Sequence, residues 1–239
     1  MIDRRKFLAG SAAFVGCRSV SRGFDGYAFI ANQDGHSIAV VDLARFTVAR
    51  QIRLESGPTE ILSHPNKPLL YAMAPGAGMI FELDFARMAV ARQIRVAPSL
   101  SGMRLDQDRN MIWALSRQSP KLLGVDLNSM KVAAAVPLPI DADRFDLSPA
   151  AKLAVASASS SGSLVFIDLE KREASGPKKI SASTGSLQFR HDGKSLLVAN
   201  TAEQRLTILQ TPSGRVVTHL RYRFVPIIFV STRMVDNFL

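Results

Sequence analysis

Short apolar runs recur along this chain at a fixed step of 42 residues, and polar turn residues separate them. The clearest markers are Asp42, Asp84, Asp126 and Asp168, each preceded by an aliphatic residue and followed by Leu or Phe; the next step reaches Gln210 in the same setting. Self-similarity at a period in the forties, carried by short apolar runs, is typical of a β-propeller with one repeat per blade.

A full repeat holds four runs of about five residues, a common strand length. Turn sequences such as HPNKP and APGAG separate them, because Pro, Gly and Asn supply the backbone angles that turns need. The pattern predicts an all-β fold, a β-propeller of about five four-stranded blades. The repeats span about 27–54, 58–96, 100–137, 142–180 and 185–220.

An α/β arrangement is the rival for such apolar runs. It requires gaps of roughly 10 to 12 residues for a crossover helix. No gap between the runs leaves that room, and helical periodicity is absent beyond the first 20 residues.

The fourth run of the first repeat alternates apolar and polar residues, which indicates the outer edge of each blade. Its arginines recur in the second repeat: Arg45, Arg50 and Arg53 return as Arg87, Arg92 and Arg95. We interpret them as charges that stop edge strands from pairing with another chain. A binding patch is the alternative.

Residues 1–20 differ from the repeats. Arg4 and Arg5 precede Phe7 and Leu8, and a short run with small residues follows. This segment resembles a twin-arginine export signal, so the twin-arginine translocase is an expected partner and the location is periplasmic or otherwise extracytoplasmic. An ordinary basic N-terminus is the alternative.

Cys17 is the only cysteine, which excludes an intrachain disulfide. FVGC resembles a lipobox, although Phe14 stands where Leu is usual and Arg18 follows the cysteine. Lipidation of Cys17 is one reading, and a small residue within a signal peptide is the other.

The C-terminal segment, residues 221–239, is atypical of the repeats. Yet Pro226 stands four periods after Pro58, and the apolar run from Ile227 to Ser231 falls where an innermost strand is expected. The first repeat lacks such a strand. Either this run completes a closed five-bladed ring, or the chain is a truncated piece of a longer propeller.

The formal net charge is +10. A basic balance can indicate nucleic-acid binding, but no recognition helix or aromatic and basic stripe accompanies it here. In an exported protein, association with anionic lipid headgroups or an acidic partner explains this charge better than nucleic-acid binding does. A cationic surface that only keeps the protein soluble is the alternative that we favour.

The repeats resemble the YVTN family of β-propeller proteins. The match is carried by FIAN at residues 29–32, LVAN at 197–200 and LSPAAK at 147–152, in phase over about residues 27–220. The resemblance implies a propeller, commonly of seven blades in this family. Such proteins serve as cell-surface binding modules, quinone-cofactor dehydrogenase subunits or lactonase-like enzymes.

Two groups of residues could bind a ligand. Asp34 and His36 share the loop NQDGH, for which we favour an ordinary β-turn. The strands expected to line the channel carry Glu60, Arg104, Asp143, Arg144 and Asp146. These carboxylates are too few for a calcium site, and we expect them to pair with the two arginines.

No histidines share a zinc-ligand spacing, so no metal and no cofactor is predicted. We expect the recurring aspartates to accept backbone N–H groups in turns. The sequence therefore favours an exported propeller that acts as a binding scaffold for an unknown protein or small molecule. A lactonase-like enzyme or dehydrogenase subunit, and an inactive truncated fragment, are the alternatives.

Overall fold

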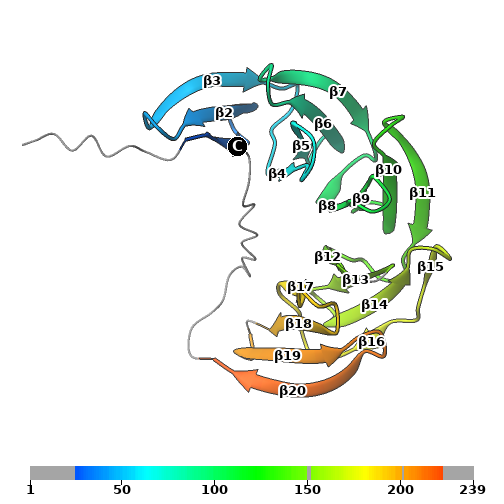
Figure 1. Cartoon of the computed structure of the whole chain (residues 1–239). Coiled ribbons are helices and arrows are strands. Elements are labelled where there is room, and N and C mark those ends of the chain that lie inside the picture. The colour runs from blue at the N-terminus through cyan, green and yellow to red at the C-terminus, as the bar shows by residue number, and fades with distance from the viewer. Residues whose placement is uncertain (1–24, 150–151, 201, 223–239) are drawn as a thin grey trace, which may run out of the picture.

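The computed structural model describes residues 25–149, 152–200 and 202–222. Five antiparallel sheets follow one another around an arc (Figure 1). Each sheet is a meander of sequential strands, so each is one blade of a propeller. The predicted all-β propeller fold is confirmed.

The blades correspond to consecutive stretches of the chain. Blade 1 holds β1 (Tyr27–Asn32), β2 (Ser37–Asp42) and β3 (Thr47–Arg53). Blade 2 holds β4 (Glu60–Ser63), β5 (Leu69–Ala74), β6 (Met79–Asp84) and β7 (Ala89–Arg95). Blade 3 holds β8 (Leu100–Asp106), β9 (Met111–Ser116), β10 (Lys121–Asp126) and β11 (Lys131–Pro137).

Blade 4 holds β12 (Arg144–Leu147), β13 (Leu153–Ala158), β14 (Ser163–Asp168), β15 (Glu173–Ala174) and β16 (Lys178–Lys179). Blade 5 holds β17 (Leu187–Phe189), β18 (Ser195–Asn200), β19 (Arg205–Gln210) and β20 (Arg215–Arg221). The inner strands β4, β8, β12 and β17 lie toward the centre of the arc, and β3, β7, β11 and β20 form its outside (Figure 1).

Blades 1 and 4 depart from the four-stranded pattern. Blade 1 has three described strands and no inner strand among the described residues. The expected closing run, Ile227 to Ser231, lies outside them. In blade 4 the outer strand is split into β15 and β16, because Pro177 cannot donate a ladder hydrogen bond.

Apolar side chains pack between neighbouring blades rather than inside single ones. Four clusters fill the four junctions from blade 1 to blade 5. The cluster between blades 3 and 4 contains Trp113, whose cross-strand partner is Gly124. A Cβ at Gly124 would lie 3.1 Å from the Trp113 ring, so the glycine makes room for the indole.

The recurring aspartates organise the turns between the third and fourth strands. Asp42 Oδ1 accepts the Ala44 and Arg45 N–H groups at 2.9 and 3.0 Å, and Asp168 Oδ1 accepts those of Glu170 and Lys171 at 2.9 Å. Asp84 and Asp126 each accept the N–H three residues on. The predicted structural role of these aspartates is confirmed.

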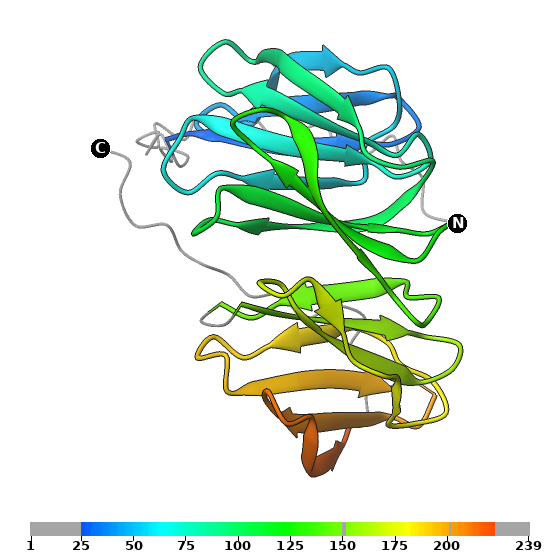
Figure 2. The ribbon, with the colours of Figure 1, turned by 90° about the vertical axis from the view of Figure 1, so that its right-hand side faces the viewer.

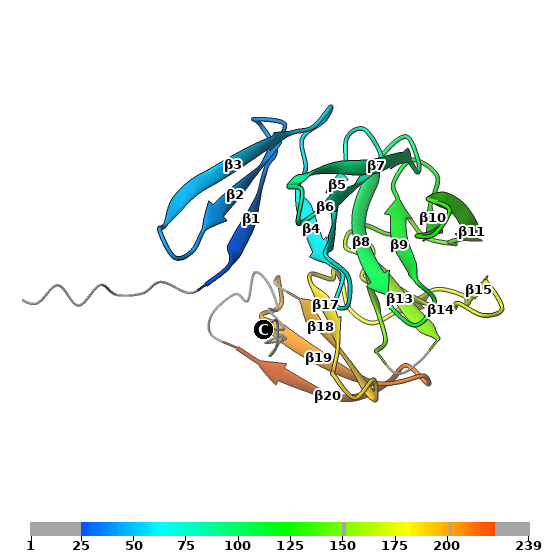
Figure 3. The ribbon, with the colours of Figure 1, turned by 45° about the horizontal axis from the view of Figure 1, so that its top comes forward.

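The propeller has two faces that carry different connections. We call the loop face the one with the loops between second and third strands and the links between blades. We call the turn face the opposite one, with the turns from first to second and from third to fourth strands. Figure 2 shows the blades from the side, with strands running across the view between the two faces. Figure 3 shows blades 1 and 5 at the two ends of the arc.

Candidate functional site

Arg104 joins three blades at the centre of the arc. It lies on β8, and its Nη1 is 2.9 Å from Oε1 of Glu60 on β4. Its Nε is 3.0 Å from Oδ1 of Asp146 on β12. The guanidinium carbon also lies 5.7 Å from the centroid of the Phe145 ring. We call Glu60, Arg104 and Asp146 the inner network.

Both carboxylates of the inner network use their second oxygen to hold the next blade. Glu60 Oε2 accepts the Met103 N–H at 3.0 Å, and Asp146 Oδ2 accepts the Phe189 N–H at 2.8 Å. Hydrogen bonds from a charged acceptor to a backbone N–H are among the stronger ones. The network therefore ties blades 2, 3, 4 and 5 together along their inner strands.

Burial controls the acidity of Glu60. Its side chain is 27% exposed. Burial raises the pKa of Glu60 above its ordinary value, and the Arg104 charge and the Met103 N–H oppose that rise. The carboxyl therefore binds a proton more readily than a free glutamate while remaining hydrogen-bonded to its neighbours.

Asp143 and Arg144 lie at the start of β12 but outside the inner network. Asp143 Oδ1 accepts the Ser159 N–H at 2.9 Å, which ties the blade 4 loop to the inner strand. Arg144 is exposed and forms no ion pair with any residue that the structure describes. The expected pairing is thus confirmed for Arg104 and not found for Arg144, because Arg104 and Phe189 already engage the Asp146 oxygens.

Asp34 and His36 are exposed on the loop face, away from the inner network. Asn32 Oδ1 accepts the Gly35 N–H at 2.9 Å, and the His36 N–H donates to the Gln33 carbonyl at 3.2 Å. His36 has a φ of 46°, and the same repeat position is Gly78, Gly162 and Gln204 in other blades, also with positive φ. The predicted turn is confirmed.

A second charged cluster, not predicted from the sequence, lies between blades 2 and 3. Arg92 on β7 donates to both oxygens of Glu82 on β6, at 2.7 and 2.6 Å, and its Nη2 donates to the Leu127 carbonyl at 2.7 Å. Glu82 is 3% exposed. Burial, and then the neighbouring Glu82, raise the pKa of Tyr71 far above its ordinary value. A glutamate within the apolar run IFELD was the signal in the sequence.

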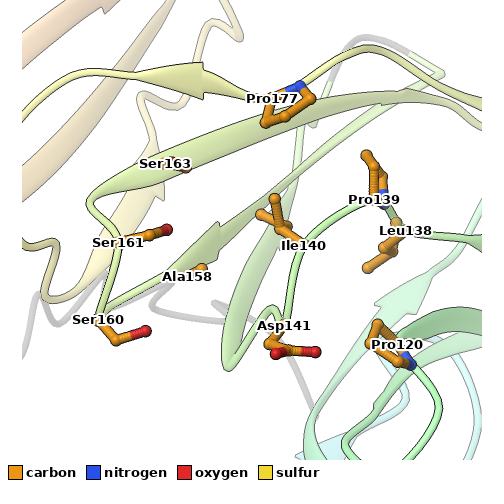
Figure 4. A pocket seen from close by; sticks show the side chains of 10 residues that line it. All are labelled: Pro120, Leu138, Pro139, Ile140, Asp141, Ala158, Ser160, Ser161, Ser163 and Pro177. Atoms are coloured by element: carbon orange, nitrogen blue, oxygen red, sulfur yellow. The ribbon is translucent and has the colours of Figure 1, made fainter.

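The loop face is hollowed where blades 3 and 4 meet. The depression has a volume of about 560 Å³, and its lining includes Pro120, Leu138, Pro139, Asp141, Ser160 and Ser161. Figure 4 shows Ser160 and Ser161 on the opposite side of the depression from Leu138 and Pro139. Hydroxyls, one carboxylate, and aliphatic and proline side chains thus surround an open space at a blade junction.

Within residues 25–149, 152–200 and 202–222, no three His, Cys, Asp or Glu side chains come together as a metal site. In the same part of the chain, no helix is long and apolar enough to cross a membrane.

Comparison with known proteins supports the fold. No protein-family model and no curated protein matches the chain. Among solved structures, it is similar to hydrazine synthase from Kuenenia stuttgartiensis, with a TM-score of 0.71 and 21% identity over 84% of this chain. It is also similar to the dihydro-heme d1 dehydrogenase NirN in complex with DHE, with a TM-score of 0.70 and 13% identity over 85% of this chain.

Both solved structures are propeller proteins, and at these identities the likeness shows the fold alone. This chain spans 65% of the hydrazine synthase chain and 45% of the NirN chain.

Proposed function

We propose that this chain is an exported β-propeller that acts as a binding scaffold in the periplasm or at the membrane surface. The observation that carries the proposal is the state of the inner carboxylates. Both oxygens of Glu60 and both of Asp146 hold neighbouring blades. Groups that could serve as acid, base or metal ligand in the channel instead hold the fold together.

Export is supported by the N-terminal pattern. Arg4 and Arg5 with Phe7 and Leu8 resemble a twin-arginine signal. FVGC, which ends at Cys17, resembles a lipobox. The repeats also resemble the YVTN family, whose members include cell-surface binding modules. We base the proposed extracytoplasmic location on these features and the proposed binding surface on the propeller.

The loop face is the proposed binding surface. It carries the depression between blades 3 and 4 and exposes Asp34, His36 and Arg144. An apolar hollow with a few polar groups is typical of small-molecule sites, and this depression combines Leu138 and Ile140 with Asp141 and serine hydroxyls. The ligand is an unidentified protein or small molecule that reaches these loops.

Site-directed photo-crosslinking tests the proposal. A photoreactive residue replaces Ser161 on the loop face, and in a matched variant it replaces Asn66, an exposed residue on the turn face. In the native cell envelope we expect one recurring adduct from position 161 and none from position 66. Adducts of equal yield from both positions, or none from position 161, contradict a loop-face scaffold.

An enzyme or dehydrogenase subunit remains the second candidate. Hydrazine synthase and the dehydrogenase NirN share the fold, and Arg144 is an exposed cation beside Asp143. Turnover of an amine or a lactone by the purified full-length protein, lost in Asp143→Asn, would favour this candidate over the scaffold.

A further inference from the structure

The repeated arginines of the outer strand and of the turn before it have three different environments. In blade 1, Arg45 pairs with Asp42 at 3.2 Å within its own turn. Arg50 donates to the Arg87 carbonyl of the next blade at 3.4 Å. Arg53, at the end of β3, is exposed and forms no hydrogen bond or ion pair through its side chain with any described residue. Turn and junction account for the first two arginines and leave the third without a structural role.

A cation without an acidic partner among the described residues lies at this end of every blade. The position of Arg53 is Arg95 in blade 2, Lys179 in blade 4 and Arg221 in blade 5. Blade 3 has Pro137 there, but the cross-strand partner of Pro137 is Lys121. We call Arg53, Arg95, Lys121, Lys179 and Arg221 the rim cations. All five are exposed, and none pairs with an acid in the described part of the chain.

The rim cations lie at the same end of every blade. In each blade the rim cation lies where the first residue of the third strand pairs with the end of the fourth strand. Examples are the pairs Ser37↔Arg53 and Ser163↔Lys179. The residue after Arg53 is hydrogen-bonded to a loop of the loop face, since the Leu54 N–H donates to the His36 carbonyl at 2.8 Å. The rim cations therefore follow the outer circumference of the loop face.

Acids on the loop face do not neutralise this ring. Glu55 accepts from Gln93, and Glu203 pairs with Arg205, whereas Asp34 and Asp141 belong to separate loops. The turn face carries both kinds of cation: Lys67, Lys131, Arg172 and Lys194 ion-pair with no described acid, whereas other cations there have acidic partners. Examples there are the pairs Arg87–Asp84, Arg109–Asp106, Lys152–Glu170 and Arg190–Asp192.

We propose that the rim cations dock the loop face onto an anionic lipid bilayer. Five cations spread around the circumference of one face match a flat, extended anionic surface, whereas a nucleic acid would need a line or groove of positive charge. Lys121 and Lys179 also flank the loop-face depression, since they adjoin its lining residues Pro120 and Ser163. The proposal rests on the loop face being the binding surface.

Vesicle co-sedimentation of the full-length protein tests this docking. The probes are phosphatidylcholine vesicles with and without about one third phosphatidylglycerol. We expect binding to the anionic vesicles alone, with loss when NaCl rises from about 0.1 M to about 1 M, because the screening length falls from about 10 Å to about 3 Å. Replacing all five rim cations with Gln should lower the partition coefficient at least a hundredfold, since each contributes about fivefold.

A control variant with the same net charge shows whether vesicle binding depends on the positions of the rim cations or only on the total charge. Gln at Arg45, Arg87, Lys171, Arg172 and Lys194 removes the same five charges from exposed positions on the turn face. This variant should retain most of the binding. The proposal is overturned if the two variants lose binding equally. It is also overturned if the protein binds neutral vesicles and the rim substitutions leave that binding unchanged.

Two further arms complete the test. If the fivefold rim variant does not fold by circular dichroism, Arg53→Gln and Lys179→Gln singly should each lower binding about fivefold. Rim-dependent binding to duplex DNA or polyglutamate without vesicle binding assigns another partner and overturns membrane docking. If the wild-type protein does not bind the anionic vesicles but still gives the crosslink at position 161, the ring is refuted and the scaffold stays in place.

Discussion

Arg92 and Arg95 stand three residues apart on β7 yet belong to two regions of the propeller. Arg92 lies at a blade junction, bonded to buried Glu82 and to carbonyls of blade 3. Arg95 lies on the rim of the loop face and pairs with no described residue. The junction arginine has a structural task, whereas the rim arginine is free to meet something outside the molecule.

The same division holds at the centre of the arc. Arg104 is paired on both sides by the inner network, and Arg144 is exposed at the start of β12. Paired charges at junctions should therefore govern stability, and unpaired ones should govern binding. Substitutions at matched paired and unpaired positions test whether stability and binding depend on different charges.

The largest effect is expected for Arg92→Met. The substitution leaves Glu82 as a buried carboxylate without its cation, and breaking a buried pair costs about 3 kcal/mol when one partner is partly exposed. Urea unfolding of the purified protein measures the loss. Arg95→Met, on the same strand, should change the free energy of unfolding by less than about 0.5 kcal/mol. Equal losses in the two variants would remove the distinction between junction and rim.

A smaller loss, of about 2 kcal/mol, is expected for Arg104→Met. Arg104 is 37% exposed, so solvent screens part of its attraction for Glu60 and Asp146, but both carboxylates lose a charge-assisted hydrogen bond. Arg144→Met is the matched control and should be neutral in the same urea titration. A neutral Arg104→Met would show that apolar packing alone holds the inner strands.

The 42-residue period was enough to predict the propeller and the role of the turn aspartates, because both depend on local patterns repeated in phase. It also placed Arg104 beside acids of the neighbouring blades. That Arg144 pairs with none of the described acids was not predictable, because it depends on which donors already occupy the Asp146 oxygens.

The Glu82–Arg92 pair depends on strand register. A bulge between Glu82 and Leu83 sets which residues face each other across β6 and β7. Four of the rim cations, Arg53, Arg95, Lys179 and Arg221, stand at the repeat step in the sequence, and only the first two were singled out from it. Lys121 joins them only through its pairing with Pro137. Cross-strand partners of this kind are properties of the folded sheet.

The smallest effect is a pH dependence confined to the inner network. Burial raises the pKa of Glu60 above its ordinary value of 4.5, so the folded protein binds this proton more tightly than the unfolded chain does. The stability that Glu60 contributes is therefore full below pH 4.5 and is lost as the pH rises through the folded pKa. The unfolding free energy of wild type minus that of Glu60→Gln should fall over this window.

Carboxyl NMR of Glu60 measures the same titration directly. The Arg104 charge lowers the pKa of Glu60, so Arg104→Met should move the titration to higher pH, while Arg104→Lys keeps a positive charge and should move it less. Lys121→Gln on the rim should leave both the NMR titration and the stability profile unchanged. A shift caused by the rim variant would mean that the two regions share one electrostatic field, and the separation of junction charges from rim charges would fail.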